Sequence, residues 1–326
     1  MEVKEYSGVL VFAEQNKNAI HKVAYELLGK GRELSEKLQC RLMAAVLGPD
    51  KTDVNELIYR GADTVYHVCD EKIFSVPDEI AYAGNLVKLI GELKPEICLF
   101  GATSFGRSVA PRVAAMLETG LTADCTDLKI DDDMKLVQIR PAFSENILAH
   151  IKSDNYPQMA TVRYKEFEEA SRDQSRTGEI IKLEAVLSSS NTVEVLEELS
   201  IEDINIADAH VVVSAGVAVK SAEDLKMINE LADLLGGQVG ASRALVETGL
   251  ISKAHQVGYS GSRVKPTVYI ACGISGAPQH LAGMKESDVI IAINNDPSAP
   301  IFNVADYSIV GDMYKIIPEL IRAIKN

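Results

Sequence analysis

The sequence predicts an α/β protein of two domains, each built on a parallel sheet. Strand-like and helix-like segments alternate over residues 9–117, and the same alternation restarts at His210. Between these regions, residues 165–207 are dominated by charged residues, Ser and Asn. Alternating strands and helices indicate parallel strands with helices on the sheet faces. We therefore expect a first domain over residues 1–205, linker included, and a second over 206–326.

In the first domain, short apolar runs predict strands, and apolar residues at helical spacing predict helices. The expected strands are 9–13, 41–47, 64–68 and 97–100, and the expected helices are 19–38, 80–93 and 106–117. Three later runs follow a polar turn and predict an antiparallel β addition to the parallel sheet: 135–140, 147–151 and 159–162.

The second domain shows a more regular alternation. The expected strands are 210–214, 238–242, 267–272, 289–294 and 307–310, and the expected helices are 222–235, 276–284 and 313–324. The pair Gly236-Gly237 is a typical helix stop. This pattern predicts a compact, doubly wound parallel-sheet domain.

Composition excludes several classes of protein. A net charge of −14 argues against nucleic-acid binding and against docking on anionic lipid. The apolar run at residues 8–13 is too short to span a membrane, and no signal peptide is visible. We expect a cytoplasmic protein without membrane insertion.

The five cysteines are scattered along the chain. No Cys-x-x-Cys and no Cys/His spacing typical of zinc sites is present, so no metal site is expected. An odd number of dispersed thiols fits a reducing compartment.

Small or polar residues follow each expected strand of the second domain. In an open parallel sheet, ligands bind at the carboxyl ends of the strands, so these five strand ends should meet in one crevice. The segment 273–277 (Gly-Ile-Ser-Gly-Ala) joins a strand to a helix, where backbone N–H groups bind phosphate readily. It is neither Gly-x-Gly-x-x-Gly nor a P-loop, and tight turns use glycine in any case.

Several segments resemble the alpha subunit of the electron-transferring flavoproteins. The most specific is the ungapped block 269–302, which contains Tyr-Ile-Ala-Cys-Gly-Ile-Ser-Gly-Ala-Pro-Gln-His at its start. Further segments carry the resemblance across the whole chain: 100–103, 119–125, 239–243, 256–258 and 281–284. The resemblance implies that residues 206–326 form an FAD-binding domain.

The resemblance also implies roles for individual residues. Arg243 is expected beside the isoalloxazine ring, where a cation stabilises the reduced flavin and raises its potential; the alternative is a surface ion pair. His280 is expected at the flavin O2 edge, and the Ser260 hydroxyl at flavin N5. The implied cofactor-binding set is Ser242, Arg243, Val257, Gly258, Tyr259, Ser260, Ser275, Gly276, Ala277, Pro278, Gln279, His280, Asn294, Asp312 and Met313.

Within this set, residues 275–279 are expected along the FAD linker and phosphates. Asn294 and Asp312 are expected at the adenosine half, where a carboxylate accepts ribose hydroxyls; the alternative for Asn294 is a turn residue. Three places depart from the family pattern. Ser144-Glu145 stands where relatives usually have Gly-Gly, which is expected to alter a contact with the partner subunit. Val217 replaces an arginine of many relatives, which removes a phosphate or ribose contact, and Tyr259 replaces a frequent glutamine beside the N5 hydroxyl.

By resemblance, the chain is the alpha subunit of a heterodimeric electron carrier rather than a self-contained catalyst. A separate beta subunit carries its own AMP or FAD. The FAD domain is expected to swivel about residues 200–206, and the redox partner to be an acyl-CoA dehydrogenase-type flavoenzyme.

Two alternatives remain open. Within the family, the complex can bifurcate electrons, with NADH as hydride donor and ferredoxin as one acceptor. In a different class, the chain is a nucleotide-binding protein for AMP without a redox role.

Overall fold

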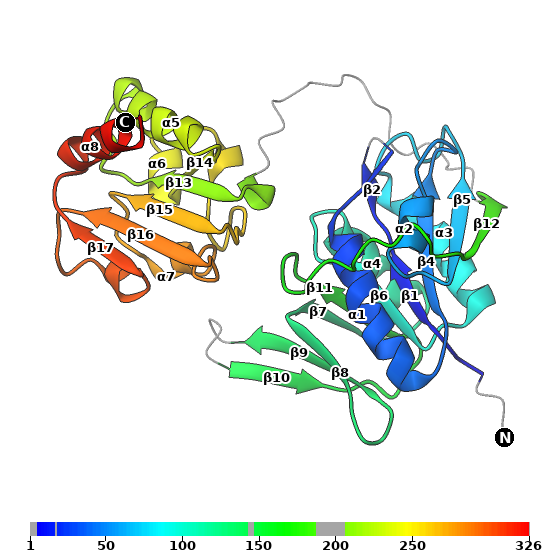
Figure 1. The fold of residues 1–326 in the computed structure, drawn as a ribbon. Helices are drawn as coiled ribbons and strands as arrows, with labels where there is room; N and C mark the ends of the chain where they lie inside the picture. The colour runs from blue at the N-terminus through cyan, green and yellow to red at the C-terminus, as the bar shows by residue number, and fades with distance from the viewer. Residues whose placement is uncertain (1–4, 17, 143–146, 187–205, 326) are drawn as a thin grey trace. The chain divides into compact units, whose positions relative to one another are not determined.

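The computed structural model describes residues 5–16, 18–142, 147–186 and 206–325 (Figure 1). The chain divides into two compact units, residues 1–196 and 197–326. The boundary expected at 200–206 falls mostly on residues outside the described ranges. Both units are α/β folds built on parallel sheets, as the sequence predicts.

The first unit is built on a seven-stranded sheet in which every pairing is parallel. Its inner strands are apolar runs buried on both faces, which is typical of parallel sheets. In spatial order, the strands are β12 (Glu179–Glu184), β5 (Thr64–Cys69), β4 (Leu42–Gly48), β1 (Val9–Phe12), β6 (Ile97–Gly101), β11 (Gln158–Val162) and β7 (Leu121–Cys125).

Helices cover both faces of this sheet. On one face α1 (Val23–Leu38) and α2 (Asn55–Tyr59) pack over the core that includes Val9 and Val11. On the other face α3 (Glu79–Leu93) and α4 (Gly106–Met116) cover the second core layer (Figure 1). The expected helix 19–38 is wrong at its start, because Ala19–Ile20 forms β3, which pairs with β2 (Gln15–Asn16).

The antiparallel addition is present as a three-stranded sheet in the order β10 (Ile147–Ile151), β9 (Leu136–Ala142) and β8 (Asp127–Ile130). The run 159–162 does not belong to it. That run lies in β11, between β6 and β7 of the parallel sheet, and all five residues of β11 are buried. Burial on both faces explains why this strand belongs to the main sheet.

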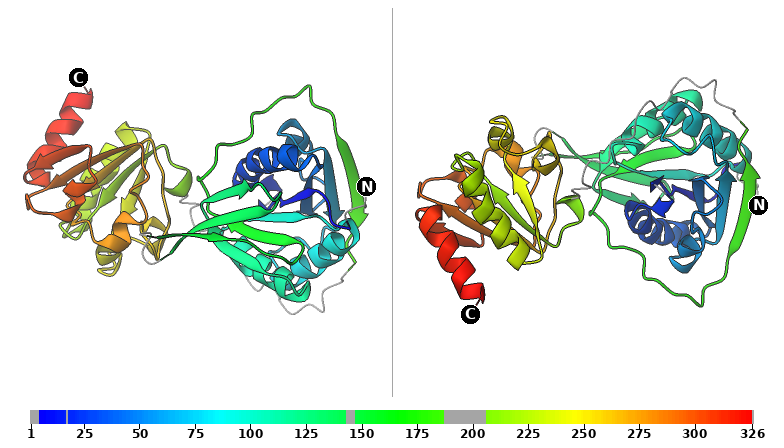
Figure 2. Two further views of the ribbon diagram at one scale, coloured as in Figure 1. Left: turned by 90° about the horizontal axis from the view of Figure 1, so that it is seen from below. Right: turned by 90° about the horizontal axis from the view of Figure 1, so that it is seen from above.

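The last strand, β12, was not predicted from the sequence. The chain reaches it by crossing over α1 and α2: Ala170 N donates to Tyr25 O, and Asp173 N donates to Tyr59 O. Figure 2 shows this long green segment running round the unit to the outer edge of the sheet. β12 has the sequence Glu-Ile-Ile-Lys-Leu-Glu and lies at a sheet edge, so charged residues interrupt the apolar run that a central strand would show.

The second unit is a five-stranded parallel sheet. Helices α5 (Ala222–Leu234) and α8 (Met313–Lys325) cover one face, and α7 (Pro278–Leu281) lies with loops over the other (Figure 1). The strands are, in spatial order, β14 (Gln238–Ala241), β13 (Val211–Ala215), β15 (Val268–Cys272), β16 (Val289–Asn294) and β17 (Tyr307–Val310).

This strand order makes the sheet doubly wound. From β13 the chain moves to β14 on one side and later returns to β15 on the other, so the winding reverses between β13 and β15. In such sheets, the crevice outside the carboxyl ends at the reversal is the usual ligand site. The expected helix 276–284 is shorter than predicted, because α7 spans only Pro278–Leu281. The turn that follows packs tightly against the loop before α7: a Cβ at Gly283 would lie 2.5 Å from Gly258 Cα.

No helix among the described residues is both long enough and apolar enough to cross a lipid bilayer.

Candidate functional site at the carboxyl edge of the second sheet

The chain approaches itself closely where the sheet reverses. Gly216 follows β13 and donates its N–H to Cys272 O at 2.8 Å. A Cβ at Gly216 would lie 2.0 Å from Gly273 O, so only glycine fits there. Gly273 and Gly276 have φ values of +65° and +89°, in the region that favours glycine. The backbone conformation of the predicted ligand-binding turn therefore requires these glycines, whether or not a ligand binds there.

Hydrogen bonds then join the five strand ends into one continuous edge. Ala241 O accepts from Val257 N at 2.9 Å, and Gln279 O accepts from Tyr259 N at 2.7 Å. On the other side, Asn294 O accepts from Gly311 N at 2.9 Å. The predicted cofactor residues from 241 to 313 are thus brought to the same sheet edge.

His280 is the buried polar group of this edge. Its side chain is 6% exposed, and its Nε2 lies 2.9 Å from the Tyr269 hydroxyl. Burial lowers the pKa of His280 to about 4, and the nearby Val257 backbone only partly opposes this. The imidazole is therefore neutral near pH 7, and its Nδ1 has no hydrogen-bond partner among the described residues. It can donate or accept a hydrogen bond but carries no charge.

The loop before α7 carries the predicted hydroxyl. Ser260 Oγ accepts from Gln256 Nε2 at 3.0 Å, and Ser260 is exposed. Tyr259 is 75% exposed, an unusual position for a large aromatic side chain. Gly258 has a φ of +143°, and a Cβ there would lie 2.9 Å from Gln279 O. The loop is thus held against α7, and Tyr259 and Ser260 are presented on the surface.

Arg243 forms the surface ion pair that was the alternative to a flavin contact. Its Nε lies 2.8 Å from Glu247 Oε1, and the two side chains are 70% and 62% exposed. Arg243 begins α6 (Arg243–Val246) directly after β14, and Ser242 caps this helix by accepting from Leu245 N at 3.4 Å. The backbone at the carboxyl edge thus positions Arg243, while its guanidinium points to Glu247.

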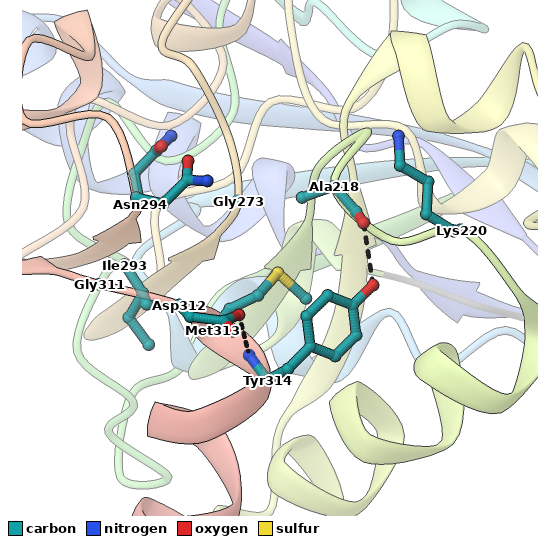
Figure 3. Close-up of a pocket in the computed structure, with 10 residues that line it drawn as sticks. Ala218, Lys220, Gly273, Ile293, Asn294, Gly311, Asp312, Met313 and Tyr314 are labelled. Atoms are coloured by element: carbon teal, nitrogen blue, oxygen red, sulfur yellow. Dashed lines mark hydrogen bonds between the residues drawn. The ribbon is translucent and has the colours of Figure 1, made fainter.

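A cavity of about 320 Å³ opens at the carboxyl ends of β15, β16 and β17 (Figure 3). Three predicted cofactor residues line it: Asn294, Asp312 and Met313. Asn294 Nδ2 donates to Ile274 O at 2.9 Å, and its Oδ1 accepts from Asp296 N at 3.0 Å. Asn294 therefore holds two loops together, as expected of the turn residue, and still borders the cavity.

Asp312 precedes α8 and accepts from Tyr314 N at 3.0 Å, so it begins that helix. Met313 is buried beneath the cavity, and its Sδ would lie 3.0 Å from a Cβ at Gly273. The amino terminus of α8, a helix of thirteen residues, therefore faces the same space as Asp312. A helix amino terminus favours bound anions.

Sequence reasoning missed two residues that line this cavity. Lys220 brings a cation, and its Nζ donates to Val217 O at 2.9 Å. Tyr314 also lines the cavity, and its hydroxyl donates to Ala218 O at 2.9 Å (Figure 3). The same hydroxyl lies 3.0 Å from Asp224 Oδ2. The family resemblance implies an arginine at position 217; Lys220, three residues after Val217, supplies positive charge in the same loop.

These features fit an elongated anionic nucleotide. The cavity offers a lysine, a helix amino terminus and polar side chains at one end of the edge. The other end offers a buried neutral imidazole with one unpartnered nitrogen. Such orphaned buried atoms are rare unless a ligand or water satisfies them. Fold and site together define a two-unit α/β protein with a doubly wound nucleotide-binding unit.

The chain belongs to the electron transfer flavoprotein family, alpha subunit. Residues 9–188 match the electron transfer flavoprotein domain, and residues 205–285 match the electron transfer flavoprotein FAD-binding domain. The family assignment confirms the sequence resemblance and identifies the second unit as a flavin-binding domain of an electron-transfer protein. It favours this reading over the AMP-binding alternative.

Similar proteins match almost the whole of this chain. The chain is 47% identical to the electron transfer flavoprotein subunit alpha of Megasphaera elsdenii, with 100% of this chain and 98% of that protein covered. It is 45% identical to the corresponding subunit of Thermoanaerobacterium thermosaccharolyticum, with 99% of each covered. A third relative is the lactate dehydrogenase (NAD(+),ferredoxin) subunit LctC of Acetobacterium woodii, 42% identical with 98% of this chain and 77% of LctC covered.

Proposed function

We propose that the second unit binds FAD along the carboxyl edge of its sheet and that the chain, paired with a beta subunit, relays electrons through it. The observation that carries this proposal is the continuous edge from Arg243 to Met313, with a polar cavity lined by Lys220 and Asp312 at one end and His280 at the other. FAD accepts and donates electrons singly or in pairs, and the protein positions and tunes it.

Each end of the edge has a separate task in this proposal. Lys220 and the amino terminus of α8 bind the phosphate and adenosine half, since both favour negative charge. Asp312 accepts hydrogen bonds from ribose hydroxyls, and Asn294 joins the two loops, at Ile274 and at Asp296, that border them. Residues 275–279 line the linker between the two ends.

At the ring end, His280 donates one N–H to the flavin O2 edge from a water-poor position. The Tyr269 hydroxyl at Nε2 fixes the ring orientation, which leaves Nδ1 available. Arg243 must leave Glu247 to reach the ring, and an exposed ion pair is worth only about 0–1 kcal/mol, so this costs little. Ser260 supplies the hydroxyl at N5, and Tyr259 packs beside the ring.

A charge reversal in the cavity tests the proposed site. Lys220→Glu replaces attraction with repulsion near the phosphates, so the FAD dissociation constant should rise at least about tenfold, equal to about 1.4 kcal/mol. Reconstitution of the flavin-free full chain with FAD, followed by flavin fluorescence, measures this. Lys226→Glu is the matched control, because Lys226 is exposed on α5 and pairs with Glu223. Equal affinities in both variants would remove the cavity from the FAD site.

We further propose a partner set. The beta subunit carries its own AMP or FAD, and an acyl-CoA dehydrogenase-type flavoenzyme exchanges electrons with the complex. The family assignment supports a beta partner, and the dehydrogenase is our inference from the family resemblance. Cytoplasmic location remains a prediction from the sequence.

Electron bifurcation is the second candidate function, favoured by the similarity to LctC, whose name includes NAD(+) and ferredoxin. In this case the complex holds two FAD and takes hydride from NADH. Counting the flavin released per heterodimer and testing for reduction by NADH decides between the two. One FAD and no reduction by NADH would exclude bifurcation.

A further inference from the structure

A cluster of three potential metal ligands lies at the carboxyl edge of the other sheet, in the first unit. One oxygen of Asp50, one ring nitrogen of His67 and the sulfur of Cys69 all lie within 4.8 Å of one another. Among the residues that the structure describes, this is the one cluster of three His, Cys, Asp or Glu side chains close enough together to hold a metal ion. No motif predicts it, because Asp50 is separated from His67 and Cys69 in sequence.

Sheet register explains why the three residues meet. His67 and Cys69 are alternate residues of β5, so their side chains point to the same face of the sheet. Strand β4 pairs with β5 so that Gly48 lies opposite Cys69, and Asp50 follows two residues after Gly48. The cluster is therefore a product of two adjacent parallel strands that end together.

The unsatisfied ring nitrogens of His67 are a second, independent observation that indicates a ligand in this cluster. The side chain is 0% exposed, yet neither ring nitrogen has a hydrogen-bond partner of good geometry. A bound metal ion would satisfy such a buried, unpartnered ring nitrogen, and histidine is the commonest metal ligand in proteins.

A cation already lies next to the cluster. Lys182 of β12 stands opposite His67 in the sheet register, and its Nζ lies 2.5 Å from Asp50 Oδ1. Cys69 Sγ lies 3.9 Å from the same oxygen. In a tetrahedral Zn²⁺ site, ligand atoms are separated by about 3.3–3.8 Å. Small side-chain shifts, with Lys182 turning outward to solvent, would bring the three ligands to that spacing.

We propose that Asp50, His67 and Cys69 bind Zn²⁺ as a three-residue site with water in the fourth position. One carboxylate oxygen, one imidazole nitrogen and one thiolate are ligands that Zn²⁺ accepts. On binding, the Cys69 thiol loses its proton to solvent and Lys182 leaves Asp50, so a proton is released and a cation is displaced. The site would link the ends of β4 and β5 at the edge where β12 joins.

The test uses the full-length chain after treatment with a chelator, with Zn²⁺ as the probe. Competition against a chromophoric chelator should give one Zn²⁺ per chain. Affinity should fall at least about tenfold in Cys69→Ser and in His67→Gln, since loss of even an outer partner of a metal ligand costs that much. Cys40→Ser is the matched control: Cys40 is also partly exposed but lies outside the cluster.

Two further readouts separate a metal site from a structural role. Lys182→Ala should bind Zn²⁺ more tightly than the wild type, because the competing cation is gone; this exposed substitution leaves the core intact. Co²⁺ in place of Zn²⁺ should give thiolate-to-metal absorption that Cys69→Ser lacks, seen as a difference spectrum. No stoichiometric Zn²⁺ uptake, equal affinity in Cys69→Ser and Cys40→Ser, or no gain in Lys182→Ala would each overturn the proposal.

Discussion

In both units the strand order of the parallel sheet reverses direction, but different side chains lie at the carboxyl ends of the strands where it reverses. In the first unit, the crevice between β1 and β6 is closed by side chains: Thr103 Oγ1 donates to Glu14 Oε2 at 2.5 Å, and Gln15 Nε2 donates to the Tyr82 hydroxyl at 3.0 Å. Burial raises the pKa of Glu14, so this carboxyl group resists ionisation. It offers no site for a phosphate.

In the second unit, the corresponding position is lined by Gly216 and Gly273, and a cavity with Lys220 opens beside it. Topology therefore supplies the crevice in both units, and the residues at the strand ends decide whether a nucleotide fits. Small residues and the Lys220 cation leave the second crevice open, whereas the half-buried Glu14 and its hydrogen-bond partners occupy the first.

The units also differ in their buried ionisable groups, and this predicts opposite pH dependence. Burial raises the pKa of Glu26 in α1 to about 8, despite hydrogen bonds from the Lys165 and Phe167 backbone. The folded unit holds a proton that the unfolded chain loses above about pH 4.5. Stability is therefore present below that pH and is lost as the pH rises to about 8.

The largest expected effect follows from Glu26. The first unit should lose about 3 to 5 kcal/mol of unfolding free energy between pH 4.5 and 8 through this group. Hydrogen exchange of α1 amides across that range measures it. Glu26→Gln should flatten this loss, whereas Glu33→Gln, on the exposed side of the same helix, should not. Identical pH profiles in the wild type and Glu26→Gln would contradict the account.

The second unit should respond in the opposite direction through His280. Its folded pKa of about 4 lies below the unfolded value of 6.5, so stability is present above pH 6.5 and is lost as the pH falls toward 4. The loss should be about 3 kcal/mol, measured by exchange of the β13 and β15 amides. His280→Gln should remove it, and the exposed His210→Gln should leave it in place. Retention of the full slope in His280→Gln would refute this assignment.

The next largest expected loss of stability comes from a steric clash at one of two glycines in the second unit. Gly276→Ala places a Cβ 2.2 Å from Ile301 N, whereas Gly236→Ala meets nothing within 4 Å, although both glycines have positive φ. Both alanine variants therefore carry the backbone strain of a positive φ. The additional clash in Gly276→Ala should lower the free energy of unfolding by about 2 kcal/mol more than in Gly236→Ala, and flavin should be released. Urea unfolding with flavin absorbance as the probe tests this. Equal costs for the two variants would show that the 275–279 turn tolerates side chains.

The smallest expected effect concerns Arg243. If the Arg243 guanidinium stabilises the reduced flavin ring, Arg243→Ala should lower the flavin midpoint potential by about 40 mV for one electron, which equals about 1 kcal/mol. Glu247→Ala frees Arg243 from its ion pair and should not lower the potential. A potentiometric titration of each heterodimer compares them. An unchanged potential in Arg243→Ala would show that Arg243 forms only the surface ion pair with Glu247 and does not act on the flavin.

Sequence patterns predicted the elements whose apolar residues are contiguous or regularly spaced. All five strands of the second unit were found this way: β13, β15 and β16 are central runs that are mostly buried, and the edge strands β14 and β17 still show as short segments between turn residues. The pattern failed for β12, an edge strand whose apolar residues are interrupted by charged ones, and for the assignment of β11, since a run shows that a strand exists but not which sheet it joins.

Site residues were predicted only where a family resemblance supplied them. Lys220 lies in a turn without a motif, and nothing local in the sequence shows that it faces the same cavity as Asp312. Asp50 and Cys69 belong to different strand ends, so only the pairing of β4 with β5 brings them together. Chemistry that arises from strand register is not visible in spacing along the chain.

A crystal structure of the heterodimer purified with its flavin tests the central claim most directly. The account predicts FAD density along the carboxyl edge of the second sheet. The ring should lie between the loop at residues 257–260 and His280, and the adenosine half should lie against Asn294 and Asp312. Flavin density at the Glu14 and Thr103 crevice of the first unit, with the second crevice holding no nucleotide, would contradict it.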